Sequence, residues 1–323
     1  MDRGHIMAGD EQISVREKGE TAKVLTIEPG ADLSAPELRR MAIETLEDGG
    51  VIYLPRSGFE LSERERELVS DTAKILSREP DVEDGRPTII FDPARGRIKK
   101  YHYAQVRGKM MRAQVKDTAR PDIQAMMSRY GEWAESVILQ LFPSYQDKLD
   151  RKRVTYRPFA RSNTQSLHID SSYGYPTQGR AMLRIFSNIH PVSRPRVWQL
   201  GEPFEPFVRR FLPSVRLSKP SWLSSILARL GIVDGTKTKY DQYIAALRAL
   251  GMRDKEYQRT APHKVVEFPP GSSWIAITDL VLHGAMSGQH SLDQTFYLPV
   301  EAMNDPSHSS LRILERLTGE ALV

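Results

Sequence analysis

The chain has 323 residues, 40% of them hydrophobic, which suits a globular protein with a substantial core in one large domain or two modest ones. Cysteine is absent, which excludes disulfide scaffolds, thiolate zinc sites and cysteine nucleophiles. The formal net charge is +5, and no apolar run approaches the roughly 20 residues that cross a bilayer. We therefore expect a cytoplasmic protein in which any metal site uses histidine, carboxylate and water.

Residues 1–30 show no sustained periodicity, and we expect them to form a flexible lead-in to a single domain over residues 31–323. The first part of that domain, residues 31–150, is predicted to be a mainly helical support. Capping boxes and apolar periodicity predict its helices, and short apolar runs predict its strands. The predicted elements are helices over 34–46, 62–76 and 122–142, the first two starting at the capping boxes Ser34/Glu37 and Ser62/Glu65, and strands over 51–54 and 89–91.

Positive charge is concentrated in two stretches of the chain. Nine Lys/Arg residues lie between Arg95 and Arg120 against one acid, Asp117, and seven lie between Phe204 and Tyr240 against two acids. Runs of this kind are often plain solvated surface. Their one-sided charge nevertheless favours an anionic partner such as nucleic acid, phospholipid or an acidic glycolipid.

From Arg153 onward the pattern changes to short strands without alternating helices, which predicts a sandwich or jelly-roll barrel. The fold class is thus α+β, a mainly β core with surrounding helices. The predicted core covers residues 151–202 and 261–300, and a C-terminal helical segment covers residues 301–323. The predicted strands are 154–156, 182–186, 196–200, 264–268, 273–278 and 294–298, with a Pro-Pro-Gly turn at 269–271.

Residues 203–260 interrupt the strand pattern as a basic and apolar helical insertion. Its first half interleaves aromatic and leucine residues, from Phe204 to Leu230, with Lys and Arg, and residues 240–252 predict a separate helix. This composition suits an interfacial membrane segment, and it suits equally a helical lid that packs on the barrel. Both interpretations stay open from the sequence alone.

The stretch Ser166-Leu167-His168-Ile169-Asp170 carries the strongest candidate chemistry. If it forms a strand, His168 and Asp170 point to the same face, because side chains alternate with period two. They would then supply two ligands of a 2-His-1-carboxylate facial triad. His-x-Asp alone is a weak signal. Among the later histidines, His283 is the best third ligand, because it follows the predicted hairpin strand and a late strand of a jelly roll lies beside an early one.

Facial coordination leaves adjacent positions open for a bidentate cosubstrate and dioxygen, which favours non-haem Fe(II). Zinc held by two histidines and a carboxylate is the competing interpretation. A zinc hydrolase would want a glutamate base next to a ligand, as in His-Glu-x-x-His, and the sequence has no such motif. Oxidative chemistry is therefore favoured.

A 2-oxoglutarate cosubstrate needs a cation for its distal carboxylate, ideally a bidentate arginine. Residues 284–300, which follow the last predicted ligand, contain no arginine or lysine. Arg184 is the preferred replacement, because it is in phase with Met182 and Phe186 and should face inward. Thr295 could add a hydroxyl. The alternatives for the cation are Arg180, Arg194 and Arg196.

Longer motifs surround these candidates. They are His168-Ile-Asp, Gly179-Arg180, Leu183-Arg184-Ile185-Phe186-x-Asn188-Ile189, Arg194-Pro-Arg-Val-Trp198-x-x-Gly201-Glu-Pro-Phe204-Glu, Phe268-Pro-Pro-Gly-Ser-x-Trp274, Thr278-Asp279, His283-x-Ala285-x-x-Gly288-Gln289 and Gln294-Thr-Phe-Tyr-Leu-Pro299. Over roughly residues 30–305 the chain resembles the Kdo hydroxylases. These are Fe(II)/2-oxoglutarate-dependent dioxygenases of Gram-negative bacteria that hydroxylate C3 of the sugar Kdo in the lipid A inner core.

The resemblance implies a cupin-like double-stranded β-helix in which His168, Asp170 and His283 hold Fe(II). It implies 2-oxoglutarate and O2 as cosubstrates, with succinate and CO2 released as Kdo is hydroxylated. Kdo-lipid A carries carboxylates and phosphates in a membrane, which suits the basic stretches and a peripheral contact with the cytoplasmic face of the inner membrane. The arginines expected to meet these anionic groups are Arg157, Arg161, Arg194 and Arg196.

Two other functions stay open at this stage. An oxygenase of the same chemistry could act on nucleic acid through the basic stretches, although we expect no nucleic-acid partner. A non-catalytic barrel could bind a membrane or polyanion through the same stretches, with His168 and Asp170 as plain surface residues.

Overall fold

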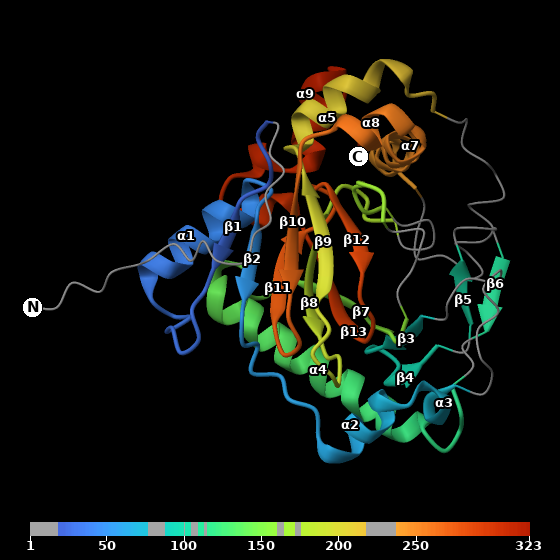
Figure 1. The fold of residues 1–323 in the computed structure, drawn as a ribbon. Helices are drawn as coiled ribbons and strands as arrows, with labels where there is room; N and C mark the ends of the chain where they lie inside the picture. The colour runs from blue at the N-terminus through green and yellow to red at the C-terminus, as the bar shows by residue number, and fades with distance from the viewer. Residues whose placement is uncertain are drawn as a thin grey trace, which may run out of the picture.

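The structure is a computed structural model that describes residues 19–76, 88–99, 101–104, 109–112, 115–159, 165–171, 176–217 and 237–323. In this part of the chain two β-sheets face each other, and helices surround them (Figure 1). Most of the strands predicted from short apolar runs are present within a residue or two of their predicted ends.

The larger sheet has eight strands, and each pairing in it is antiparallel except β1 with β2. Across the sheet the order is β1 (Val24–Thr26), β2 (Val51–Leu54), β11 (Ser273–Ile277), β8 (Ala181–Asn188), β13 (Ser291–Leu298), β7 (Asp150–Arg157), β3 (Ile89–Asp92) and β4 (Arg97–Ile98). The smaller sheet, in the order β10 (His263–Phe268), β9 (Arg196–Gly201) and β12 (His283–Ser287), is also antiparallel. Strands β5 (Tyr101–Ala104) and β6 (Lys109–Arg112) form a separate ribbon.

Side chains on the two faces of the larger sheet enter different cores, as the period-two alternation requires. On β8, Phe186 faces the smaller sheet, where its ring lies 4.9 Å from that of Trp198 and 5.5 Å from that of Trp274. Leu183 and Ile185 face the other way and join the core beneath the helices. The two sheets therefore close around an aromatic layer, as a jelly roll requires.

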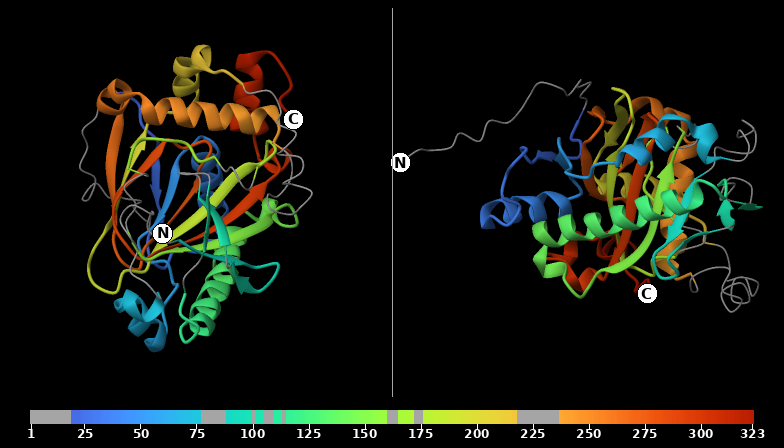
Figure 2. Two further views of the ribbon diagram at one scale, coloured as in Figure 1. Left: turned by 90° about the vertical axis from the view of Figure 1, so that its right-hand side faces the viewer. Right: turned by 90° about the horizontal axis from the view of Figure 1, so that it is seen from below.

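Helices account for most of the remaining elements. Their bounds are α1 (Pro36–Glu47), α2 (Glu63–Ser70), α3 (Thr72–Ile75), α4 (Arg120–Leu141), α5 (Phe204–Phe211), α7 (Lys239–Arg253), α8 (Lys255–Thr260) and α9 (Ser310–Thr318), with 3₁₀ turns at Pro143–Tyr145, Leu212–Ser214, Val300–Ala302 and Pro306–His308. Helices α1 and α4 run side by side against the outer face of the larger sheet (Figure 2). Among the described helices, none has the length and apolar character needed to span a bilayer.

Of the two predicted capping boxes, one is present in the structure and the other is not. Ser62 and Glu65 form the predicted capping box, with each side chain bonded to the other residue's backbone N–H. Ser34 does not cap a helix: its hydroxyl and N–H both donate to Asp32, and α1 starts at Pro36. The helix predicted to run to Leu76 is interrupted at Asp71, which ends α2 and caps α3.

Three other sequence expectations differ from the structure. Strand β1 lies in the predicted lead-in, and β4 to β6 add strands that the sequence did not predict to the expected helical support. His168 and Asp170 are not in a strand: His168 makes an isolated bridge with His283, and Asp170 lies in a loop. His283 does not simply follow a hairpin strand, since it begins its own strand, β12.

The described part of the helical insertion is packed on the protein. Phe207 and Phe211 of α5 are buried, with their rings 5.7 and 5.0 Å from that of Tyr257 in α8. Their apolar surface therefore faces the core, which favours the lid interpretation for this part. The leucine-rich stretch that begins at Trp222 lies outside the described residues.

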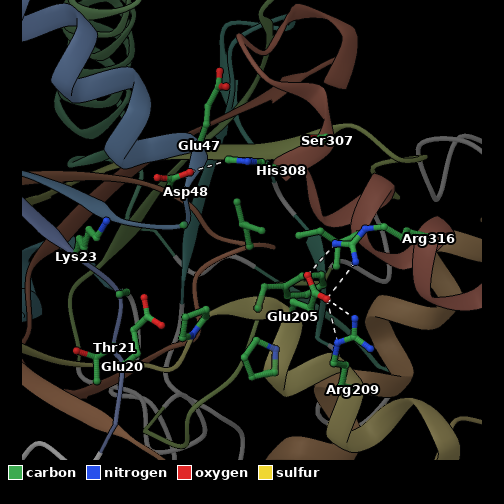
Figure 3. A pocket seen from close by; sticks show the side chains of 17 residues that line it. Glu20, Thr21, Lys23, Glu47, Asp48, Glu205, Arg209, Ser307, His308 and Arg316 are labelled. Atoms are coloured by element: carbon green, nitrogen blue, oxygen red, sulfur yellow. Dashed lines mark hydrogen bonds and ion pairs between the residues drawn. The ribbon is translucent and has the colours of Figure 1, made fainter.

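A pocket of about 650 Å³ lies between residues 20–23, the end of α1, α5 and α9 (Figure 3). Its charges are largely paired with one another: Glu205 bonds Arg209 at 2.6 Å and Arg316 at 2.7 Å. Of the predicted site residues that the structure describes, none lines this pocket. The candidate chemistry lies elsewhere, between the two sheets.

Candidate metal centre

Backbone pairing brings the three predicted metal ligands together. The N–H of His168 donates to the carbonyl of His283, and the N–H of His283 donates to the carbonyl of His168, both at 2.9 Å. The N–H of Asp170 donates to the carbonyl of Thr278 at 2.7 Å, just beyond β11. The donor atoms of His168, Asp170 and His283 all lie within 4.8 Å of one another.

Hydrogen bonds to the backbone fix how both imidazoles are presented. Nδ1 of His168 lies 2.7 Å from the carbonyl oxygen of Ser166, and Nδ1 of His283 lies 2.9 Å from that of Val281. A carbonyl oxygen only accepts, so each Nδ1 carries the proton and each Nε2 keeps a free lone pair. These Nε2 atoms lie 3.8 and 4.0 Å from the two carboxylate oxygens of Asp170, too far for hydrogen bonds.

Burial and neighbouring charge hold the three groups in the ionisation states that a metal requires. Burial lowers the pKa of both histidines, aided at His168 by the Arg248 guanidinium, so the rings are neutral. Burial alone would raise the pKa of Asp170. The positive charges of the Arg184 and Arg248 guanidiniums outweigh it and bring that pKa well below its usual range. The site therefore offers two neutral nitrogens and one carboxylate.

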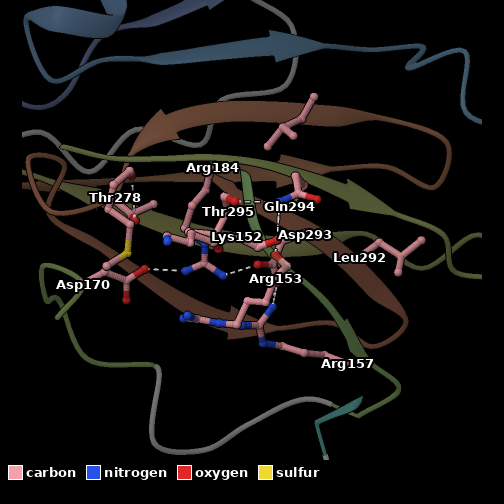
Figure 4. A network of polar contacts seen from close by, with 12 residues as sticks. Lys152, Arg153, Arg157, Asp170, Arg184, Thr278, Leu292, Asp293, Gln294 and Thr295 are labelled. Atoms are coloured by element: carbon pink, nitrogen blue, oxygen red, sulfur yellow. Dashed lines mark hydrogen bonds and ion pairs between the residues drawn. The ribbon is translucent and has the colours of Figure 1, made fainter. Parts of the chain in front are cut away.

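A chain of charged side chains runs from Asp170 to Arg157 at the end of β7 (Figure 4). Nη1 of Arg184 donates to Oδ2 of Asp170 at 2.5 Å, and its Nη2 donates to Asp293. Asp293, which is fully buried on β13, also accepts from Arg157 of β7. Arg184 thus faces inward, as its phase predicted, and is held between two carboxylates.

Two residues of this site were missed from the sequence. Asp293 lies beside Gln294 and Thr295 in a polar stretch that resembles solvated surface, whereas every residue of β13 is buried. Arg248 of α7 donates to the carbonyl of Ile169 at 2.6 Å and to Oδ1 of Asp170 at 3.3 Å. An arginine in a helix with other basic residues gives no signal of such a contact.

Unsatisfied hydroxyls lie beside this charge chain. Thr295 is opposite Arg184 in the β13–β8 ladder, and Thr155 is opposite Asp293 in the β13–β7 ladder. Both threonines are buried, and neither hydroxyl has a hydrogen-bond partner among the described residues; the same holds for Nε of Arg184. Buried orphaned donors of this kind suit an anion, such as a carboxylate, that completes them.

The remaining predicted arginines are not gathered at the triad. Arg196 is buried and donates to the carbonyl of Gly288, and exposed Arg194 lies just before it. On β9, Leu200 pairs with His283, so Arg196 is four residues, or about 13 Å, away along the strand. Arg180 is paired with Asp150. Arg161 lies outside the described residues.

The donor set fits a divalent transition metal. Two imidazoles and one carboxylate on one side of an ion form the facial triad of non-haem iron proteins. Trp198 stacks on the ring of His283 at 4.8 Å and fixes its plane. A glutamate base beside the ligands, which zinc hydrolysis would need, is lacking from the described site.

Comparison with known proteins agrees with this geometry. A sequence-family model described as 3-deoxy-D-manno-oct-2-ulosonic acid (Kdo) hydroxylase matches residues 30–321. The chain belongs to the Kdo hydroxylase family. A search of the curated proteins gave no match.

Three crystal structures of the Kdo hydroxylase KdoO, a non-heme Fe(II) α-ketoglutarate-dependent dioxygenase, are similar to the chain at 32% sequence identity. The complex with succinate and Fe(III) gives a TM-score of 0.78 over 92% of this chain and 97% of KdoO. The complex with α-ketoglutarate and Fe(III) gives 0.77 over 93% and 97%. The cobalt(II) complex gives 0.78 over 92% and 97%.

These matches confirm the predicted family, the α+β fold with its cupin-like jelly-roll core, and the enzyme class. They also confirm the prediction of Fe(II), 2-oxoglutarate and O2 as the cofactor and cosubstrates of this class. The roles of individual residues rest on the geometry described above.

Proposed function

We propose that His168, Asp170 and His283 hold the Fe(II) with which this Kdo hydroxylase modifies C3 of Kdo in Kdo-lipid A. The chain is an Fe(II)/2-oxoglutarate-dependent dioxygenase by family. One observation carries the residue assignment. In each imidazole Nδ1–H donates to a backbone carbonyl, and Nε2 faces the carboxylate of Asp170, whose oxygens lie 3.8 and 4.0 Å away.

We assign the distal carboxylate of 2-oxoglutarate to Arg184 and Thr295, with Thr155 as a further donor. Nε of Arg184 and the two hydroxyls are buried donors on one face of three adjacent strands, without partners among the described residues. An incoming carboxylate would accept from all three and so remove the cost of leaving them unsatisfied.

Bound iron supplies an oxidant that inserts oxygen into a C–H bond while 2-oxoglutarate is decarboxylated to succinate. The residues of the chain orient the metal ligands and shield them from water. Trp198 fixes the plane of the His283 imidazole, and Arg184 and Arg248 keep Asp170 ionised. Arg157, whose side chain is 17% exposed at the end of β7, is the described arginine best placed to meet a sugar carboxylate. Arg161, Arg194 and Arg196 remain predicted contacts for anionic groups of the acceptor.

Visible absorption tests the ligand assignment. Fe(II) followed by 2-oxoglutarate is added anaerobically to the full chain, and a metal-to-cosubstrate charge-transfer band is expected. Asp170→Ala and His283→Ala should abolish the band. His308→Ala, which removes a half-exposed histidine at the separate pocket, should keep it. An unchanged band in either ligand variant would overturn the assignment.

Substrate class is tested by succinate formation and by mass spectrometry of the acceptor. Kdo-lipid A should gain one oxygen atom and stimulate 2-oxoglutarate turnover. Stimulation by DNA or RNA instead would favour the nucleic-acid alternative.

We also propose a peripheral, electrostatic contact with the membrane that carries this acceptor. Exposed Arg209 and Arg210 of α5 support it, whereas the apolar face of α5 is buried in the protein. Vesicles that contain anionic lipid should sediment the protein at low salt and release it at high salt. Binding that does not depend on salt would contradict an electrostatic contact.

A further inference from the structure

The segment that carries His168 and Asp170 has two backbone edges, and strand pairing satisfies only one of them. His168 exchanges both backbone hydrogen bonds with His283 of β12. In an extended chain the groups of the neighbouring residues, Leu167 and Ile169, point to the opposite edge. Both residues are fully buried, so these groups need partners away from water.

Side chains of the helical insertion supply the partners on that second edge. Gln258 of α8 accepts from the N–H of Leu167 at 2.8 Å and donates to its carbonyl at 3.0 Å. Arg248 of α7 donates to the carbonyl of Ile169 at 2.6 Å. Gln258 also donates to the carbonyl of Gly251 at 2.9 Å, which ties the pairing to the end of α7. The two side chains therefore stand where another strand would pair.

We propose that Gln258 and Arg248 are positioning residues that make the helical insertion a structural part of the metal centre. The proposal rests on the assignment of His168, Asp170 and His283 as ligands. Gln258 sets the register of the backbone just before His168, and Arg248 holds both the backbone and the carboxylate at Asp170. Without them the ligand segment keeps its backbone bonds to His283 and Thr278 and the ion pair of Asp170 with Arg184, but loses the bonds that hold Leu167 and Ile169 on the second edge.

The coupling runs in both directions. If packing of α7 and α8 orders the ligand segment, metal held by that segment must stabilise the packing of α7 and α8 by the same free energy. The insertion is thereby distinguished from a lid that merely covers a finished site, since a lid could be loosened without changing metal affinity.

Amide hydrogen exchange of the metal-free chain tests the contact itself. Gln258→Ala should speed exchange of the Leu167 N–H at least tenfold, because its acceptor is lost. Exchange of the His168 N–H should change less, since its acceptor is the carbonyl of His283. Equal acceleration of both amides would show general loosening and overturn the proposed edge pairing.

Cobalt(II) titration, followed by visible absorption, tests the consequence. Gln258→Ala and Arg248→Gln should weaken cobalt(II) binding about 10- to 100-fold, the usual effect of losing a group that orients a metal ligand. Arg253→Gln, an exposed arginine on the same helix, is the matched control and should bind as wild type does. Arg248→Lys, which keeps a donor and a charge, should recover part of the loss.

The outcomes separate the two proposals. Absence of cobalt(II) binding by wild type, or unchanged binding by Asp170→Ala, would sink the ligand assignment. Loss in Asp170→Ala with wild-type affinity in both Gln258→Ala and Arg248→Gln would leave that assignment standing and overturn the positioning role. If Gln258→Ala does not fold, Gln258→Glu replaces it: the acceptor for Leu167 N–H is kept, the donor is lost, and weaker binding is again expected.

Discussion

Asp293 offers the sharpest test of how the buried charges are balanced. Its carboxylate is fully buried and accepts from Arg184 on one side and Arg157 on the other. Asp293→Asn keeps the size and shape of the side chain but removes its charge. Two guanidinium groups, 7% and 17% exposed, then lose their shared counter-ion.

Breaking a buried ion pair by neutralising one partner typically costs about 3–5 kcal/mol of unfolding free energy. Unfolding entropy is about 2.1 cal/mol/K per residue near 60 °C, which gives roughly 0.7 kcal/mol/K for 323 residues. The ratio of these quantities predicts a fall in Tm of about 4–7 °C. Arg184 also loses one of the two carboxylates that orient it.

Differential scanning calorimetry of wild type and variants measures this shift. Asp117→Asn is the matched control, because Asp117 is 97% exposed and its ion pair with Arg120 lies at the surface. That control should shift Tm by less than about 1 °C, as surface pairs contribute little. The double variant Arg157→Gln/Asp293→Asn should lower Tm by less than the sum of the two single changes, since one of the unpaired cations is removed. A Tm unchanged by Asp293→Asn, or strict additivity, would refute the reasoning.

Three further changes probe the site and its surroundings. Thr295→Val should raise the Kd for 2-oxoglutarate, measured anaerobically on the Fe(II) form, about 10-fold, because a hydrogen bond to a carboxylate is lost. Gly284→Ala should greatly weaken Fe(II) binding, since a Cβ there would lie 2.3 Å from the carbonyl oxygen of Gln165 and push the ligand segment away from β12. Burial, with the nearby His190, lowers the pKa of His290 to about 4, so this ring is neutral when folded. The unfolded ring titrates near 6.5 and takes up protons first as pH falls, so His290 should account for a loss of about 2 kcal/mol of unfolding free energy between pH 7 and 5. Urea unfolding measures this contribution as the difference between wild type and His290→Asn.

Each of these has a clear contrary result. An unchanged Kd in Thr295→Val would remove Thr295 from the cosubstrate site. Wild-type Fe(II) affinity in Gly284→Ala would show that the ligand segment tolerates displacement. A pH dependence of unfolding that is the same in His290→Asn and wild type would assign the acid sensitivity to other groups. Asparagine suits this position because the backbone φ of His290 is +50°.

Local patterns in the sequence predicted much of the fold. The strands of the barrel follow from runs such as Met182 to Phe186, because alternation and β-branched residues are local properties of the chain. The Ser62/Glu65 capping box is local in the same sense, and it was right. The Ser34/Glu37 box failed because Asp32, two residues earlier, competes for the serine.

The candidate residues of the metal centre could also be predicted from the sequence before the fold was known. His168 and Asp170 are close in sequence, and His283 could be chosen because jelly-roll topology brings a late strand beside an early one. The inward direction of Arg184 followed from its phase with Met182 and Phe186. Each of these inferences uses spacing along one element or a general rule of topology.

Only the tertiary structure revealed what holds those ligands in place. Gln258 and Arg248 contact the ligand segment across 91 and 79 residues of sequence, and Asp293 bonds Arg184 across 109. Polar residues in a helix or in a polar stretch of a strand look like solvated surface. Whether they are buried depends on which distant element packs over them, and no local pattern records that. The sequence by itself therefore determined the candidate ligands and the strands of the barrel, and the packing of the insertion and the facing sheets decided their environment.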